Sequence, residues 1–334
     1  MEPLFYSLDA VLPLVLMCAA GYLLKRLGVI TEDWATMANK LNFRCFLPVL
    51  LFINIYEAEG IGGIDWGLGG FVSAGIMLAF ALGWVIVKLF VPDRRQKGVV
   101  WQTAFRSNFT LLGMPLALAL YGTTAGQAVA SLSILAIPLF NVLTVTVFQL
   151  YNDKQKKDIK KKSHSETVKK IITGVLKNPL IIGIAAGIIS LIIRGIFQDA
   201  GIAFRVKDIK FLYSALSGLS QVASPLALVA LGAQFSFKAA RGMLVPITAG
   251  VLARLVIVPL LVLSIAFIFT GYRGPAFAAL VALFGSSTAV SGSVMAAEMG
   301  GDKVLAGQLL FWTTCLSAVT IFIFVLCFRV LGAL

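Results

Sequence analysis

The chain has 334 residues, of which 59% are hydrophobic and only 13% are charged, and its mean hydropathy is +0.94. A water-soluble domain is close to half apolar and about one quarter charged, so this composition excludes a soluble globular protein. The net charge of +13 does not indicate a nucleic-acid partner, because no arginine-rich or aromatic-interleaved segment accompanies it and membrane proteins concentrate lysine and arginine in their cytoplasmic loops.

Stretches of about 20 apolar residues are long enough to cross a bilayer. Ten such stretches are predicted, at 6–26, 36–56, 67–91, 99–121, 126–151, 178–197, 211–235, 243–269, 275–299 and 304–331. We therefore expect an all-α integral membrane protein that spans the cell's inner (plasma) membrane many times and is surrounded by membrane lipid.

The charge of the loops predicts the orientation of these spans. Segment 152–177 carries nine lysines and three acids and is the only long hydrophilic segment, so we expect it in the cytoplasm. The basic residues between other spans then fall on the same side, namely Lys25, Arg26, Arg94, Arg95, Lys97, Lys238 and Arg241. With ten spans and a cytoplasmic middle loop, both termini are predicted outside.

The middle loop divides five predicted helices from five, and the two halves share short patterns in the same order. Pro13–Gly21 reads PLxxxxAAG, and so does Pro179–Gly187. The tripeptide AGQ opens the fifth predicted span and also the tenth. An odd number of helices per half inverts one half relative to the other, so we predict a first five-helix repeat at 1–151, a basic loop at 152–177 and a second, inverted repeat at 178–334. Inverted repeats are typical of secondary transporters.

The fourth and ninth predicted spans contain residues that weaken a helix. Asn108 precedes Gly113 and Pro115, and a proline inside a helix removes a backbone hydrogen bond. In the ninth span, Ser286, Ser287 and Thr288 follow a glycine. Free backbone groups at membrane depth are tolerated where they line a cavity, so we predict two crossing broken helices that bind substrate. A simple proline kink in the fourth span and close packing of small residues in the ninth are the alternatives.

Arginines inside the predicted spans are candidates for attracting an anion, because intramembrane charges are costly and usually functional. Arg44 and Arg254 lie deepest, with Asn42 beside the former, and we predict that all three contact substrate. Arg106 is placed nearer the cytoplasmic end, about two turns from Lys97. The alternative for each arginine is a structural contact with helix-end carbonyls or snorkelling to the membrane surface.

Several classes of function find no residues to support them. The single histidine, His164, falls in the basic loop, and neither a catalytic pair nor a phosphate-binding loop is present, so we do not expect an enzyme. The four cysteines lie in apolar stretches without CxxC spacing, so we expect no metal and no cofactor. Acids are nearly absent from the spans, which weakens the case for sodium coupling and favours a uniporter or a proton-linked route.

Two segments resemble the auxin efflux carrier family. Asn108-x-x-x-x-Gly113-x-Pro115, followed by Tyr121-Gly122, is similar to the family's fourth helix, and Asn42 with Leu47–Phe52 is similar to its second. The resemblance extends over the whole chain and favours a bacterial member similar to malate and malonate permeases. It implies a fold like that of the bile-acid/sodium symporters, with a scaffold (helices 1, 2, 6 and 7), an elevator-type transport domain (helices 3–5 and 8–10) and, by analogy, a homodimer formed through the scaffold.

The chain departs from the family at the second crossing, where Ser287 and Gly292 stand in place of the usual prolines. Asn108 and Pro115 match the first crossing. We therefore expect a secondary transporter of small organic anions, carboxylates in particular, with the arginines, hydroxyls and freed amides as ligands. A sodium- or proton-coupled organic anion symporter and an anion channel are the alternatives.

Overall fold

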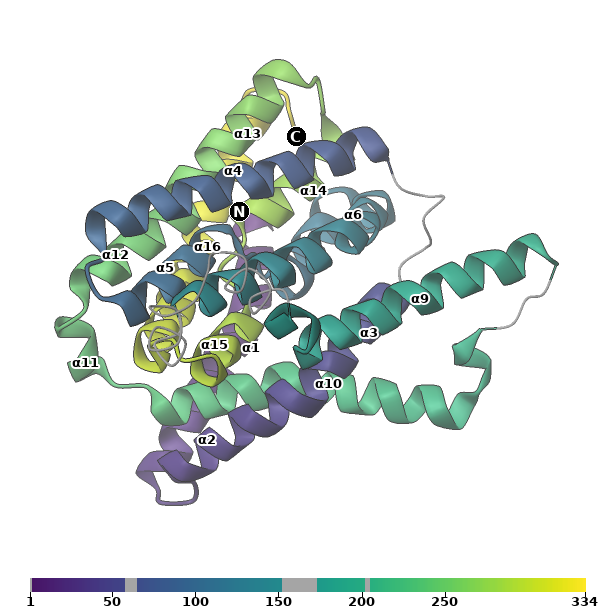
Figure 1. Ribbon diagram of the computed structural model, residues 1–334. Helices are drawn as coiled ribbons and strands as arrows, with labels where there is room; N and C mark the ends of the chain where they lie inside the picture. The colour runs from purple at the N-terminus through teal and green to yellow at the C-terminus, as the bar shows by residue number, and fades with distance from the viewer. Residues whose placement is uncertain (1, 58–64, 152–172, 202–204) are drawn as a thin grey trace, which may run out of the picture.

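The computed structural model describes residues 2–57, 65–151, 173–201 and 205–334. Most of the predicted cytoplasmic loop 152–177 therefore lies outside the described residues. Within them the protein is helical, and the one extended pairing is a bridge between Ser107 and Thr288. Figure 1 shows the helices gathered around α6 and α16, with α9 and α10 reaching outward at one side.

In the first half of the chain, helical structure is broken between α5 and η3, and the other helical stretches are continuous or kinked. The elements are α1 (Glu2–Arg26), α2 (Glu32–Leu41), the π-helix η1 (Asn42–Phe46), α3 (Leu47–Tyr56), α4 (Trp66–Phe90), α5 (Arg94–Phe105), the π-helix η3 (Phe109–Gly113) and α6 (Met114–Tyr151). Gly122 divides α6 at a positive φ of 62°, a conformation that glycine adopts without a steric penalty. The predicted fourth and fifth spans thus separate where the sequence analysis places their boundary.

The second half follows a similar order. Its elements are α9 (Pro179–Asp199), the 3₁₀-helix η4 (Val206–Asp208), α10 (Lys210–Gln234), α11 (Phe237–Arg241), α12 (Leu244–Leu252), the π-helix η5 (Ala253–Ile257), α13 (Val258–Phe269), α14 (Gly274–Gly285), α15 (Val290–Glu298) and α16 (Lys303–Val330). Side chains or prolines at the helix starts explain several boundaries: Asn178, for example, accepts a hydrogen bond from the Leu180 amide and precedes Pro179.

Six of the described helical stretches are long and apolar enough to cross a membrane: 66–90, 109–151, 179–199, 210–234, 244–269 and 303–330. Many of their large apolar side chains are exposed, among them Leu89, Phe211, Ile268, Phe269 and Val330. Such a surface is stable in lipid and not in water. The protein is therefore a multi-pass membrane protein.

The helices form two groups that pack mainly within themselves. In one group α1 lies against α10, α3 lies against α9, and α2 also contacts α10. In the other group α6 packs on α14, α4 on α5, and α15 on α16. Contacts of α1 with α16 and of α3 with α6 join the groups.

Candidate substrate site

Two helix interruptions meet at the centre of the protein. α5 ends at Phe105 and helical structure resumes at Phe109, whereas α14 ends at Gly285 and α15 begins at Val290. The Asn108 amide donates to the Ser287 carbonyl at 2.9 Å, and the Ser107 hydroxyl donates to the Leu283 carbonyl at 2.5 Å. The two non-helical segments, 106–108 and 286–289, therefore satisfy part of each other's backbone hydrogen bonding at membrane depth.

The position of the first interruption corrects the sequence-based expectation. Gly113 and Pro115 do not break the helix: helical structure is continuous from Phe109 through both residues, and Pro115, which has no backbone N–H, lies where the π-helix η3 passes into α6. Ser107 and Asn108 mark the break instead, since short polar side chains compete with the helix for backbone hydrogen bonds.

Arg254 stabilises the crossing, the place where segments 106–108 and 286–289 meet. Its side chain is fully buried, and it donates to the carbonyl oxygens of Ser286 at 2.8 Å and Leu283 at 3.0 Å, with a longer contact to Phe105 at 3.5 Å. These carbonyls belong to the C-terminal ends of α14 and α5, which carry partial negative charge and lack intrahelical donors. Arg254 thus has the structural role that the sequence analysis held as the alternative for it.

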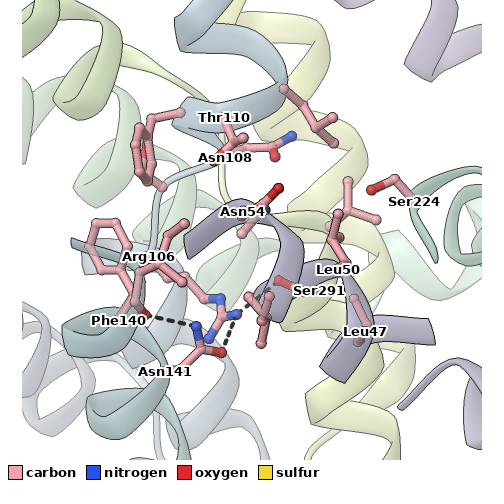
Figure 2. Close-up of a pocket in the computed structure, with 17 residues that line it drawn as sticks. Leu47, Leu50, Asn54, Arg106, Asn108, Thr110, Phe140, Asn141, Ser224 and Ser291 are labelled. Atoms are coloured by element: carbon pink, nitrogen blue, oxygen red, sulfur yellow. Dashed lines mark hydrogen bonds between the residues drawn. The ribbon is translucent and has the colours of Figure 1, made fainter. Parts of the chain in front are cut away.

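A cavity of about 130 Å³ lies beside the crossing, between the two groups of helices. We call it the central cavity, and Figure 2 shows the side chains around it. It is lined by Leu47, Leu50, Leu51 and Asn54 of α3, by residues 106–111, by Ile137, Phe140 and Asn141 of α6, by Ser224 of α10, and by Ala289, Val290 and Ser291. Apolar side chains from α3 and α6 therefore face a polar wall formed by the first interruption.

Arg106 is the charged residue of this wall and is only 2% exposed. Its Nη2 atom donates to Asn141 Oδ1 at 2.9 Å and to Ser291 Oγ at 2.8 Å, and these contacts are visible in Figure 2. Asn141 is itself fixed, because its Nδ2 atom donates to the Ile137 carbonyl at 2.8 Å. The guanidinium is therefore fixed through only one of its three nitrogens, Nη2.

Three further donors in the cavity wall have no hydrogen-bond partner among the described residues. Arg106 Nε and Nη1 are buried and make no hydrogen bond, and the same is true of Asn108 Nδ2. A buried cation without a counter-charge is costly, and no residue that lines the central cavity is acidic. The arrangement is therefore suited to accept the oxygens of an anion, to which a guanidinium can bind through two parallel hydrogen bonds.

A second cavity of about 200 Å³ adjoins the central cavity and shares Asn54, Phe109, Thr110 and Ile137 with it. It extends along α6 toward Glu57, which lies just after the end of α3. Because Asn54 and Thr110 line both spaces, a ligand that passes from one to the other must pass these two side chains.

The structure brings only one of the predicted site residues to the central cavity. Asn108 lines it. Ser286, Ser287 and Thr288 are buried within the crossing itself; the Ser286 hydroxyl donates to the Ala282 carbonyl, and Ser287 accepts from Thr314 Oγ1 at 3.3 Å. The hydroxyls of Ser286 and Ser287 thus bond within the protein, and none of the three residues lines the central cavity.

The other predicted site residues lie apart from it. Arg44 is exposed and lines a separate apolar depression with Pro48 and Pro179. Asn42 is fully buried and donates to the Ala223 carbonyl at 2.7 Å, which ties η1 to α10. A Cβ atom added at Gly113 would lie 2.5 Å from the Ala282 carbonyl oxygen, so this glycine permits close packing of η3 on α14.

Sequence reasoning missed five of the polar residues around the cavity. The sequence places Arg106 near the cytoplasmic end of its span because it lies about two turns from Lys97. Asn54 carried a usable signal, since it is the one polar side chain of α3 before the terminal tyrosine. Asn141 was equally compatible with a helix-tying role, and Ser291 and Ser224 could not be distinguished from other small residues.

An all-helical membrane protein with a cavity at two crossing helix interruptions is typical of secondary transporters. A family model described as membrane transport protein matches residues 6–325. The chain therefore belongs to this family, which is of the auxin efflux carrier type that the sequence resembles.

Individual relatives agree with this assignment. An uncharacterized transporter from Methanothermobacter thermautotrophicus is 24% identical over 319 residues, which is 94% of this chain and 96% of the relative. Among solved structures, the sodium proton antiporter MjNhaP1 from Methanocaldococcus jannaschii at pH 8 matches with a TM-score of 0.52 and 12% identity, over 96% of this chain and 99% of the antiporter. At this identity the match concerns the fold alone.

Proposed function

We propose that the protein is a secondary transporter of small organic anions, carboxylates in particular. The observation that carries this proposal is the pair of unpartnered nitrogens of Arg106, in the wall of a cavity that Asn108, with its unpartnered Nδ2, also lines and that no acid lines. Arginine presents a planar fork that matches a carboxylate. Leu47, Leu50 and Phe140 would contact the apolar part of the substrate and limit its size.

An inverted repeat is supported by the packing of two equivalent glycines. Gly21 and Gly187 occupy the same place in the shared PLxxxxAAG pattern. A Cβ added at Gly21 would lie 2.1 Å from the Val229 carbonyl oxygen, and one at Gly187 would lie 3.1 Å from the Phe52 carbonyl oxygen. Val229 and Phe52 stand four residues after Pro225 and Pro48, which the two halves also share. Each half thus places its first helix against the same position in the second helix of the other half.

We further propose an elevator mechanism with alternating access. In this scheme the group with α1, α2, α3, α9 and α10 is the scaffold, and the remaining helices carry the crossing and the substrate. The location of the central cavity supports the scheme, because α3 and α10 line one side of it and the crossing and α6 line the other. Sliding of the second group along the first would carry Arg106 and its ligand across the membrane without opening a continuous pore.

Cation coupling is the main alternative, because the fold is similar to that of a sodium proton antiporter. A cation site at membrane depth generally requires carboxylates. The central cavity is lined by none, and the described residues contain no group of three or more His, Cys, Asp or Glu that could hold a metal ion. These observations favour flux that does not depend on sodium, either as uniport or with a proton-linked anion.

The proposal is tested by flux into and out of proteoliposomes. Radiolabelled malate, malonate, succinate, lactate and indole acetate would each be measured with and without sodium and pH gradients. Saturable flux of at least one carboxylate is expected, together with loss of flux in Asn108→Ala. Arg44→Gln is the matched control, because it removes an exposed arginine that does not line the cavity.

The outcomes separate the candidates. Flux that follows the substrate gradient and saturates supports a carrier, whereas flux that rises linearly with concentration supports an anion channel. Absence of flux for every carboxylate in folded, reconstituted protein would contradict the substrate class.

A further inference from the structure

A third cavity, separate from the central cavity and from the one that adjoins it, lies where α1 ends, α2 begins and α10 ends. This space of about 580 Å³, here called the basic pocket, is lined by Tyr22, Lys25, Arg26, Glu32, Gln234, Phe235, Ser236 and Lys238. None of these residues lines the central cavity. The pocket contains three basic side chains and one acid, so its lining carries a net positive charge.

The charges in the basic pocket are only partly neutralised. Lys25 Nζ and Glu32 Oε1 form an ion pair at 2.5 Å. Arg26 Nη2 donates to the Tyr22 hydroxyl at 2.7 Å, which is a neutral acceptor and uses one of five guanidinium donors. Lys238 is exposed, as is Arg26. Arg26 and Lys238 therefore supply the excess positive charge.

An apolar groove continues from the basic pocket. It has a volume of about 220 Å³ and is lined by Val15, Cys18, Ala19, Tyr22, Leu231, Gly232, Phe235 and Phe311. Tyr22 and Phe235 line both spaces, so the groove begins where the basic pocket ends. It runs between α1 and α10 toward α16 and contains no charged side chain.

We propose that these two spaces together bind one anionic phospholipid of the cytoplasmic leaflet. The phosphate and its headgroup contact Arg26 and Lys238, and one acyl chain lies in the groove against Tyr22 and Phe235. The charge of the pocket complements a phosphate, and basic pockets between helices on the cytoplasmic side are suited to anionic headgroups. Lys25 and Lys238 are among the basic residues at the ends of spans whose charge predicts a cytoplasmic location, so the proposed site would lie at the leaflet that holds anionic lipid.

The groove distinguishes this site from general attraction between a basic surface and a membrane. Diffuse attraction requires only charge and is not sensitive to an apolar side chain several residues away. A site that holds both headgroup and chain requires Arg26 and Lys238 at one end and free space near Ala19 at the other. Variants at the two ends therefore test the proposal independently.

Binding would be measured by titrating purified protein with palmitoyl-oleoyl phosphatidylglycerol or with the phosphatidylcholine of the same chains, with native mass spectrometry as the readout. The parent is expected to bind the first phosphatidylglycerol at least about fivefold more tightly than phosphatidylcholine, because two basic groups contribute. In the double variant Arg26→Gln/Lys238→Gln this preference is expected to fall to about one. The matched control is Lys40→Gln/Arg95→Gln, which removes the same charge from exposed residues outside the pocket.

The groove is tested with Ala19→Phe, and with the milder Ala19→Leu as a second variant. Both are expected to weaken phosphatidylglycerol binding by at least about fivefold, while Ala20→Phe, next to Ala19 and outside the groove, is expected to bind as the parent does. Thermal unfolding of every variant checks that it is folded. An unchanged lipid preference in Arg26→Gln/Lys238→Gln, an equal loss in Lys40→Gln/Arg95→Gln, or full binding by both Ala19 variants would each overturn the proposal.

Discussion

The backbone amide of Asn108 donates to the carbonyl of Ser287 across the centre of the protein, at 2.9 Å. This bond joins two interrupted helices that are about 180 residues apart in the chain, and it holds Arg106 at the edge of the central cavity. The two buried arginines near the crossing therefore differ in how their hydrogen-bond donors are used. Arg254 uses its donors on helix-end carbonyls, whereas Arg106 keeps two nitrogens unpartnered.

Arg106→Gln is expected to reduce carboxylate flux strongly without destabilising the fold. The substitution removes a buried charge whose desolvation is only partly compensated, so its effect on the free energy of unfolding is expected to lie within about 1 kcal/mol of neutral. Flux is expected to fall at least about tenfold, since a charge-assisted contact to the anion contributes about 1.5–3 kcal/mol. Flux assays in proteoliposomes and thermal unfolding in detergent would be run on the same preparations.

Arg106→Lys refines this test. Lysine keeps the positive charge but lacks the planar fork, so flux is expected between that of the parent and that of Arg106→Gln. A transported carboxylate should also raise the unfolding temperature of the parent by binding the folded state, and this rise should vanish in Arg106→Gln. A large loss of stability in Arg106→Gln would instead assign this arginine a structural role.

Arg254→Gln is expected to give the opposite pattern. The shorter neutral side chain cannot reach the carbonyls of Ser286, Leu283 and Phe105 together, and a buried acceptor that loses its partner costs about 1–3 kcal/mol. The unfolding temperature should therefore fall by several degrees. Arg44→Gln, at an exposed position, should leave it unchanged. Stability of Arg254→Gln equal to that of the parent would show that the crossing does not depend on this side chain.

The close approach of the two halves can be tested with glycine-to-alanine pairs. A Cβ at Gly232 would lie 1.9 Å from the Cys18 carbonyl oxygen, and one at Gly183 would lie 2.4 Å from that of Pro48. Because these contacts are with backbone, the helices must separate, and each substitution is expected to cost about 1–3 kcal/mol.

The same helices contain matched controls. Gly218 in α10 and Gly195 in α9 have no atom within 4 Å of an added Cβ, so alanine there should be neutral or stabilise by up to about 1 kcal/mol through helix propensity. Thermal unfolding of the four single variants measures the contrast. If Gly232→Ala and Gly183→Ala unfold at the same temperature as Gly218→Ala and Gly195→Ala, the α1–α10 and α3–α9 contacts are looser than described.

The sequence predicted the positions of the helices well because membrane spans depend on length and hydropathy, which can be read locally. It also indicated which two spans are interrupted. It misplaced the first interruption because proline and glycine are the strongest local signals, whereas Ser107 and Asn108 leave the helix through pairing with a segment about 180 residues away. The roles of Arg106 and Arg254 depend on the same long-range pairing, so the sequence could not distinguish a ligand-facing arginine from one that caps helix ends.

The sign of the substrate's charge can be tested at Asn54, which lines both the central cavity and the adjoining one. Asn54→Asp is nearly isosteric and adds a carboxylate along the path to Arg106. An anionic substrate would then be repelled, and an ion pair between Asp and Arg106 would compete with it, so carboxylate flux is expected to fall about tenfold or more. Asn54→Ser, which keeps a neutral hydrogen-bonding group, is the control and should retain most of the flux. Flux of a carboxylate that rises in Asn54→Asp would show that the rate-limiting species in this cavity is a cation, and would favour the sodium- or proton-coupled alternative.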